Sequence, residues 1–152
     1  MRVRAVLEAI ERAKRLKFQE TDQLSTDLTV EHLLPSQWEE HWPLSDGERP
    51  TRDETVQALY ANEENDSHVG QIVRRRRLLN TFGNLTILSK PLNSKISNGP
   101  WEAKRDALND HSVLVMNREI IKLEQWREDQ IEARGQALFE IALGIWPYPK
   151  VC

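Results

Sequence analysis

The residues best suited to chemistry lie in three short segments that follow one another in a fixed order. Glu31 and His32 lie in the first apolar segment, Asn84 opens a second apolar run, and nine residues later Asn93 begins a polar segment that contains Lys95. Carboxylate and carboxamide oxygens can hold a hard divalent cation, and a neutral imidazole beside them can deprotonate a water molecule. Together these groups are sufficient for metal-assisted hydrolysis of a phosphodiester bond.

The three segments resemble the motifs of the His-Asn-His endonucleases, also called ββα-metal or His-Me finger nucleases. That superfamily reads roughly (D/E)-H-(I/L)-x-P, then N-L-x-x-L, then N-x-x-K or N-x-K. Further landmarks resemble the C-terminal nuclease domain of GmrSD-type modification-dependent restriction enzymes: Ser-Asn-Gly-Pro-Trp-Glu-Ala-Lys at 97–104, Trp126, Arg134 and Ile-Trp-Pro at 145–147. The resemblance covers about residues 1–148.

The resemblance implies a role for each motif residue. His32 is the general base, since an unperturbed imidazole titrates near pH 6.5 and is largely neutral at pH 7. Asn93, with Glu31, holds one Mg²⁺ or Mn²⁺ ion. Asn84 belongs to the catalytic set because the matching Asn bonds the backbone of the loop that carries the base. Lys104 completes this set as a positive charge near the scissile phosphate.

Each assignment has a structural alternative. His32 could be a buried, hydrogen-bonded side chain. Glu31 precedes it on an expected strand, so the two side chains should point to opposite faces, and Glu31 could instead orient a neighbour or be solvated. Asn84 could be a turn residue after Gly83, a role compatible with the motif role. Asn93 could be a helix N-cap or a surface residue.

Candidate DNA contacts follow from basic and amide side chains. Asn98 and Lys95 match the GmrSD-like pattern, and a run of four arginines supplies Arg74, Arg75 and Arg77. Four consecutive helical residues sweep about 300° around the axis. The arginines therefore cannot all face one groove, and we expect at least one to pair with an internal carboxylate.

Composition indicates one domain spanning residues 1–152. The net charge of −3 argues against a general nucleic-acid coat, although a local basic patch remains compatible with a nuclease.

No apolar run approaches the roughly 20 residues of a membrane span, and no secretory signal is visible. The single cysteine is Cys152, and these features together favour a cytoplasmic location. We expect no structural zinc, because the second Cys pair found in many relatives would fall at Ser89 and Leu92. A first helix without a clear N-cap suggests a C-terminal fragment of a longer protein.

Periodicity and breaker residues predict an α+β, mostly helical fold. Its ββα-metal core, about residues 27–97, should contain two short antiparallel strands at 29–34 and 85–88 plus a helix carrying Asn93 and Lys95. About five or six helices should surround that core. They are expected over 2–16, from the Thr51 capping box with Val56, Leu59 and Tyr60 inward, over 67–79, over 101–109, from an Asn117 N-cap to about 124, and along a final stripe of Leu138, Ile141, Ala142 and Ile145.

The sequence therefore predicts a metal-dependent DNA endonuclease domain. Its substrate should be double-stranded DNA, and the resemblance implies restriction of modified phage DNA together with an N-terminal NTP-using module that this chain lacks. Two alternatives stay open. One is a catalytically silent module that binds DNA or a partner on a nuclease fold, which the acidic net charge and the glutamate in place of the more usual aspartate favour. The other is an RNase or toxin, because a ββα site can cut either backbone.

Overall fold

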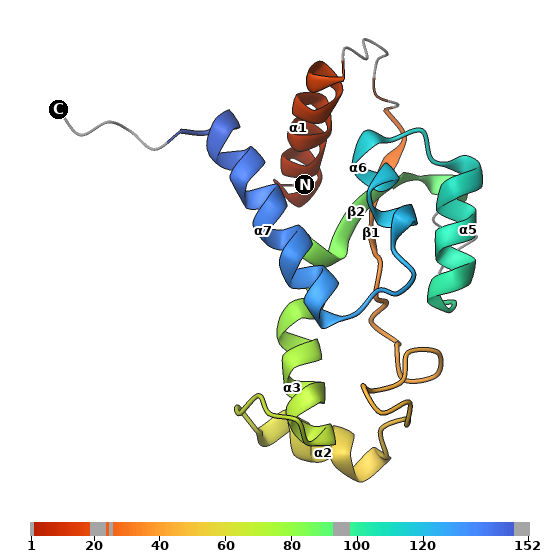
Figure 1. The fold of residues 1–152 in the computed structure, drawn as a ribbon, viewed down its shortest axis with the longest axis vertical. Coiled ribbons are helices and arrows are strands. Elements are labelled where there is room, and N and C mark those ends of the chain that lie inside the picture. Colours follow the sequence, from red (N-terminus) through yellow and green to blue (C-terminus); the bar gives the residue numbers. More distant parts are fainter. Residues whose placement is uncertain (1, 19–23, 25, 93–97, 148–152) are drawn as a thin grey trace, which may run out of the picture.

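The computed structural model describes residues 2–18, 24, 26–92 and 98–147. Its elements, shown in Figure 1, are α1 (Arg2–Lys17), β1 (Leu28–His32), α2 (Arg52–Tyr60), α3 (His68–Leu79), the 3₁₀ turn η1 (Phe82–Asn84), β2 (Leu85–Ser89), α5 (Trp101–His111), α6 (Val115–Arg118), the 3₁₀ turn η2 (Ile120–Lys122) and α7 (Glu128–Ile145). The mostly helical α+β prediction is confirmed.

The two strands form an antiparallel pair whose register runs from Leu28 opposite Ser89 to His32 opposite Leu85. The first strand ends two residues earlier than expected. Leu33 donates its N–H to the carbonyl of Asn84, and the next residue, Leu34, bonds the Asn84 side chain instead of a strand. The chain therefore leaves the sheet immediately after His32.

Helices cover both faces of this two-stranded sheet. Figure 1 shows α1 and α7 side by side on one side and α5 on the other, with α2 and α3 beyond the end of the sheet where His32 lies. Because both faces are covered, β2 is apolar along most of its length, and Ile87 and Leu88, which point to opposite faces, are both buried.

The core has two parts. One lies between α1, the strands and α7, and is built from residues such as Leu7, Ile10, Ile87 and Leu138. The other lies under the segment that follows β1 and includes four tryptophans: Trp38, Trp42, Trp101 and Trp126. Within it the Trp101 and Trp126 rings stack with centroids 5.6 Å apart. The second core holds that segment against α3 and α5.

Several helix predictions are confirmed. The Thr51 capping box opens α2, with Thr51 and Glu54 bonding each other's backbone N–H groups. In α7, Leu138 is buried and Ile141, Ala142 and Ile145 are half-buried, as the stripe predicted. The expected helix through 93–97 lies outside the described residues, although 90–92 are helical.

Two expectations are wrong. Val56, Leu59 and Tyr60 of α2 are exposed, because this nine-residue helix buries Ala58. Asn117 is not an N-cap: it lies inside α6, buried, where it accepts a bond from the Thr86 hydroxyl at 2.6 Å. The segment 117–124 is thus the end of α6 followed by η2.

No helix among the described residues is both long and apolar enough to cross a membrane.

Candidate active site

His32 is the last residue of β1. It lies at the end of the two-stranded sheet nearest to α3. Its side chain is half-buried, and its Nε2 atom is 2.9 Å from Oδ1 of Asn80, which follows the last residue of α3. The imidazole is therefore held from a second element, 48 residues away in the sequence. Sequence reasoning missed Asn80, since an Asn at a helix C-cap is common for backbone reasons alone.

The Asn84 side chain fastens the segment that follows His32. Its Oδ1 accepts bonds from the N–H of Leu34 at 2.8 Å and from the indole N–H of Trp126 at 3.1 Å. Its Nδ2 donates to the carbonyls of Leu34 at 2.8 Å and Leu79 at 2.9 Å. The amide is fully buried and uses both donors and its acceptor on the protein. It therefore acts on the backbone around the imidazole.

Helix α7 holds the segment that carries Asn84. Nη1 of Arg134 donates to the carbonyls of Gly83 at 2.7 Å and Leu85 at 2.8 Å, one on each side of Asn84. Burial lowers the pKa of Arg134 to about 10. Gly83 lies so close to α7 that a Cβ there would be 2.1 Å from the Ile131 carbonyl oxygen. Arg134, quoted above as a family landmark, thus supports the second motif.

Lys104 from α5 reaches the first motif from the other side. Its ammonium donates to the His32 carbonyl at 2.7 Å and to Oε1 of Glu31 at 3.2 Å. The Lys104 side chain is fully buried, whereas that of Glu31 is 15% exposed. Burial lowers the pKa of Lys104, and the Glu31 charge partly opposes this effect. One carboxylate oxygen of Glu31 is thereby engaged.

Glu31 and His32 reach toward different helices, as strand alternation predicted. Glu31 meets Lys104 of α5, and His32 meets Asn80 at the end of α3. Across the described residues, no group of three or more His, Cys, Asp and Glu side chains could hold a metal ion. The structure thus brings Lys104, Glu31, His32 and Asn84 to one end of the two-stranded sheet, where Glu31 and His32 bond different partners.

The remaining motif residues lie apart from this cluster or outside the description. Asn93 and Lys95 are outside the described residues. Asn98 is exposed and donates to the side-chain oxygen of Gln37 at 3.0 Å. Gln37 belongs to the segment after β1, so Asn98 lies next to the continuation of the first motif.

The arginines of α3 are engaged within the protein. Arg74 bonds Asp129 at 2.7 Å and Glu132 at 2.5 Å, and Arg77 pairs with Glu64 and with Glu132 at 2.8 Å. The Glu132 carboxylate, held by both arginines, has a lowered pKa. These two side chains remain partly exposed, so a phosphate would have to compete with carboxylates already in place.

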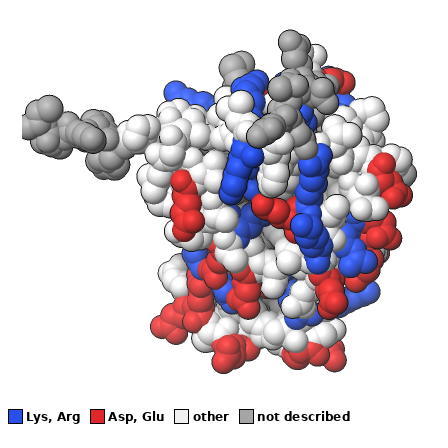
Figure 2. All heavy atoms as spheres, turned by 45° about the horizontal axis from the view of Figure 1, so that its top comes forward, with Lys and Arg blue, Asp and Glu red and all other residues white. Residues whose placement is uncertain are grey.

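Arg75 is the arginine least available to DNA. Its guanidinium donates to the carbonyls of Trp42 at 2.6 Å and Pro43 at 3.2 Å, pairs with Glu128, and lies 4.3 Å from the centre of the Trp38 ring. The side chain is 3% exposed. The structure gives Arg75 a packing role, and its placement does not support the predicted phosphate contact. Figure 2 shows positive and negative side chains intermixed on the face drawn, without a continuous basic surface.

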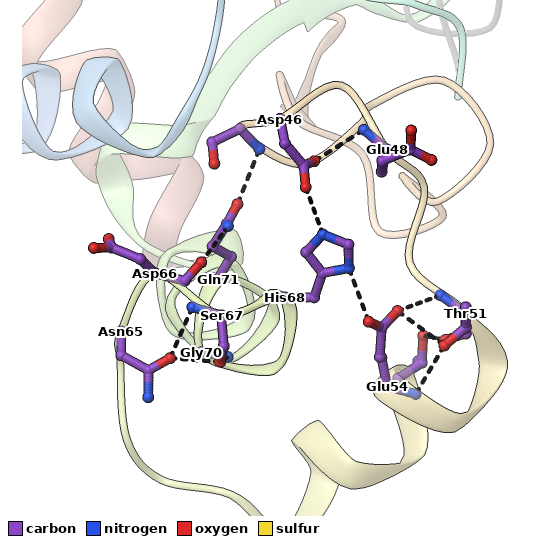
Figure 3. Close-up of polar contacts among 12 residues, drawn as sticks. Asp46, Glu48, Thr51, Glu54, Asn65, Asp66, Ser67, His68, Gly70 and Gln71 are labelled. Atoms are coloured by element: carbon purple, nitrogen blue, oxygen red, sulfur yellow. Dashed lines mark hydrogen bonds and ion pairs between the residues drawn. The ribbon is translucent and has the colours of Figure 1, made fainter.

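A second polar cluster, which the sequence did not reveal, ties α2 to α3 (Figure 3). His68, at the start of α3, has Nε2 2.6 Å from Asp46 and Nδ1 2.8 Å from Glu54. Both ring nitrogens face carboxylates, so both bonds require an imidazolium. These two partners, Asp46 first, raise the pKa of His68. The cluster fixes the segment between the first two motifs.

Comparison with known proteins gives one match. The family model for the C-terminal domain of GmrSD restriction endonucleases matches residues 1–141. No curated protein and no solved structure matches the chain. Because the family match spans nearly the whole sequence, the chain belongs to the family of C-terminal domains of GmrSD restriction endonucleases.

Proposed function

We propose that this chain is a metal-dependent DNA endonuclease domain of the His-Asn-His type, with His32 as its general base. The observation that best supports this function is that the second motif forms hydrogen bonds to the backbone that follows the first motif. A buried Asn84 bonds both backbone groups of Leu34, two residues after His32. Such fixation of a general base is what proton transfer in a transition state requires.

In this mechanism His32 accepts a proton at Nδ1 from a water molecule, and the water oxygen attacks the phosphorus atom. The bond from phosphorus to the 3′ oxygen breaks, and the leaving oxygen takes a proton from solvent. Lys104 fixes the His32 carbonyl and neutralises Glu31, so the strand end keeps its geometry as charge builds on the phosphate.

Glu31 and Asn93 are the residues we assign to a Mg²⁺ or Mn²⁺ ion. Lys104 engages one oxygen of the Glu31 carboxylate, and the other is a ligand of the kind Mg²⁺ prefers. A site with one carboxylate suits Mg²⁺, which usually keeps several of its own waters. The bound ion would supply electrostatic stabilisation of the negative charge that develops on the phosphate.

We propose double-stranded DNA as the substrate and modified foreign DNA as the natural target, within the cytoplasm and together with an NTP-using module. The restriction-endonuclease family supports the DNA substrate. Asn98, Arg74 and Arg77 are the described candidates for phosphate contact, with Lys95 a further one from the sequence. For Arg74 and Arg77, contact requires exchange of a carboxylate for a phosphate.

The test is Mg²⁺- or Mn²⁺-dependent nicking of supercoiled plasmid by the wild type, His32→Ala and His41→Ala. His41 is an exposed histidine and serves as the matched control. We expect loss of nicking in His32→Ala alone. Equal nicking by all three proteins would refute the assignment of the base.

Two further measurements separate the alternatives. Faster cleavage of RNA than of DNA of equal length would favour the RNase reading. DNA binding without cleavage across several divalent ions would favour a silent binding module.

A further inference from the structure

We infer that Asn80 is the positioning residue that places the proton of the His32 ring on Nε2 and leaves Nδ1 free to accept one. The inference rests on the proposed function only in taking His32 as the base. Oδ1 of Asn80 is 2.9 Å from Nε2 of His32. A carbonyl oxygen cannot donate a hydrogen bond, so the ring nitrogen must donate it. In a neutral imidazole the other nitrogen, Nδ1, then carries the lone pair.

The fold holds Asn80 at a fixed distance from His32. Asn84 donates from a single amide nitrogen to the carbonyl of Leu79, adjacent to Asn80, and to the carbonyl of Leu34, two residues after His32. The end of α3 and the end of β1 are thereby joined through one buried side chain. Because the backbone on both sides is held in this way, the His32 ring cannot turn without breaking its contact with Asn80.

The rest of α3 is fastened as well, so Asn80 does not depend on one bond. Arg75, five residues earlier, bonds the carbonyls of Trp42 and Pro43 in the segment that follows β1. Thr81 bonds the Leu78 carbonyl through both its N–H, at 3.0 Å, and its hydroxyl, at 2.7 Å. Hydrogen bonds therefore hold the chain both before and after Asn80.

A purely structural role for Asn80 makes a different prediction. As the C-cap of α3, Asn80 contributes its backbone N–H, which bonds the Leu78 carbonyl. That bond survives any side-chain substitution except proline. The Asn80 side chain is exposed, so removing its amide should change stability little. Its contact with His32 is the part that catalysis would register.

The experiment compares Asn80→Leu, which removes the acceptor oxygen at similar volume, with Asn80→Asp, which keeps an acceptor oxygen. Asn62→Leu, an exposed asparagine on the α2–α3 connection, is the matched control. The full chain is labelled with ¹⁵N-histidine, and the His32 ring signals are assigned by their loss in His32→Gln. Spectra are recorded without metal at a pH where the ring is neutral.

In the wild type and Asn80→Asp we expect ¹⁵N shifts that show a protonated Nε2 and an unprotonated Nδ1. In Asn80→Leu the two ¹⁵N shifts should move toward each other, because neither tautomer is then favoured by an acceptor. The kcat for plasmid nicking should fall about 10- to 100-fold in Asn80→Leu, with KM within about twofold, by analogy with the loss on removing the hydrogen-bond partner of a metal-ligating histidine. Asn62→Leu should match the wild type in both measurements.

A proton on Nδ1 in the wild type would overturn the inference. So would an Asn80→Leu protein with an unchanged ring spectrum and unchanged kcat. The spectra decide the proton position whether or not the chain cuts DNA. Expected spectra with no nicking by any variant would refute cleavage by this chain on its own and leave the assignment of the proton to Nε2 supported.

Discussion

Replacing Lys104 with methionine tests the most consequential charge in the site. The Lys104 ammonium is fully buried and lies 3.2 Å from the Glu31 carboxylate and 2.7 Å from the His32 carbonyl. Methionine keeps most of the side-chain volume and removes the charge. Glu31 then faces the interior without its partner, and the carbonyl at the end of β1 loses its donor.

The magnitude follows from these distances. Two unit charges 3.2 Å apart at an effective dielectric constant near 20 attract by about 5 kcal/mol, and the desolvation of the ammonium offsets much of that gain. Breaking such a pair typically costs about 3–5 kcal/mol because one charge remains uncompensated. Glu31 is 15% exposed and can regain some water, so we expect the lower end, about 3 kcal/mol, or a fall in Tm of about 6–12 °C.

The assay is urea unfolding followed by tryptophan fluorescence, applied as a double-mutant cycle. Lys104→Met and Glu31→Gln are measured alone and together. The double variant carries no unpaired charge, so its cost should be smaller than the sum of the single costs by about 2 kcal/mol. Arg105→Met, the next residue on α5, whose ion pair with Asp106 is long at 3.8 Å, is the control and should cost less than about 1 kcal/mol.

Additive costs would refute the reasoning, since they would mean that the two charges do not depend on each other. A Lys104→Met protein within about 0.5 kcal/mol of the wild type would refute it as well, since that is the range of ordinary surface substitutions. The first result would mean that the Lys104–Glu31 pair contributes no coupling energy, and the second would place the ammonium in water.

Three other substitutions, one of them with a control on α7, test the supports of the site. Asn84→Ala should cost about 3–5 kcal/mol in urea unfolding, because the Leu34 and Trp126 N–H groups lose their buried acceptor; a cost below about 1 kcal/mol would contradict this. Gly83→Ala should lower Tm, because the new Cβ would meet the Ile131 carbonyl at 2.1 Å, whereas Gly144→Ala on α7 meets nothing within 4 Å and should stabilise by about 0.5–1 kcal/mol. His68→Gln should destabilise the chain more at pH 6 than at alkaline pH. The raised His68 pKa means that its contribution is fully present below the unfolded value of about 6.5 and is lost as pH rises through the folded value, so a pH-independent effect would contradict the imidazolium.

Much of the architecture could be predicted from the sequence because it depends on local patterns. The short, largely apolar segment at 85–88 becomes a strand buried on both faces, and the stripe from Leu138 to Ile145 becomes the inward side of α7. The Thr51 capping box acts over three residues and therefore forms as predicted. The alternation of Glu31 and His32 likewise follows from strand geometry, and it led correctly to different partners.

The parts that sequence could not give depend on contacts between distant segments. Nothing in a lone Asn80 indicates an imidazole 48 residues earlier, and His68 meets Asp46 and Glu54 only because α2 and α3 fold against each other. The same limit explains the wrong expectation for α2. Apolar spacing places Val56, Leu59 and Tyr60 on one side of the helix, but packing on α3 uses Ala58.

The arginine run shows how strongly tertiary contacts decide the use of charge. A basic tetrad in a nuclease domain predicts DNA contact, but Arg74, Arg75 and Arg77 each bond a carboxylate on α7. These pairs hold α3 against α7, the helix whose Arg134 also fixes the segment of Asn84. Since the end of α3 carries Asn80, the partner of His32, the arginines stabilise the geometry around His32. The segment between the first two motifs therefore contributes to the site by holding α3 in place, and a DNA backbone approaching α3 meets Arg74 and Arg77 already paired with carboxylates.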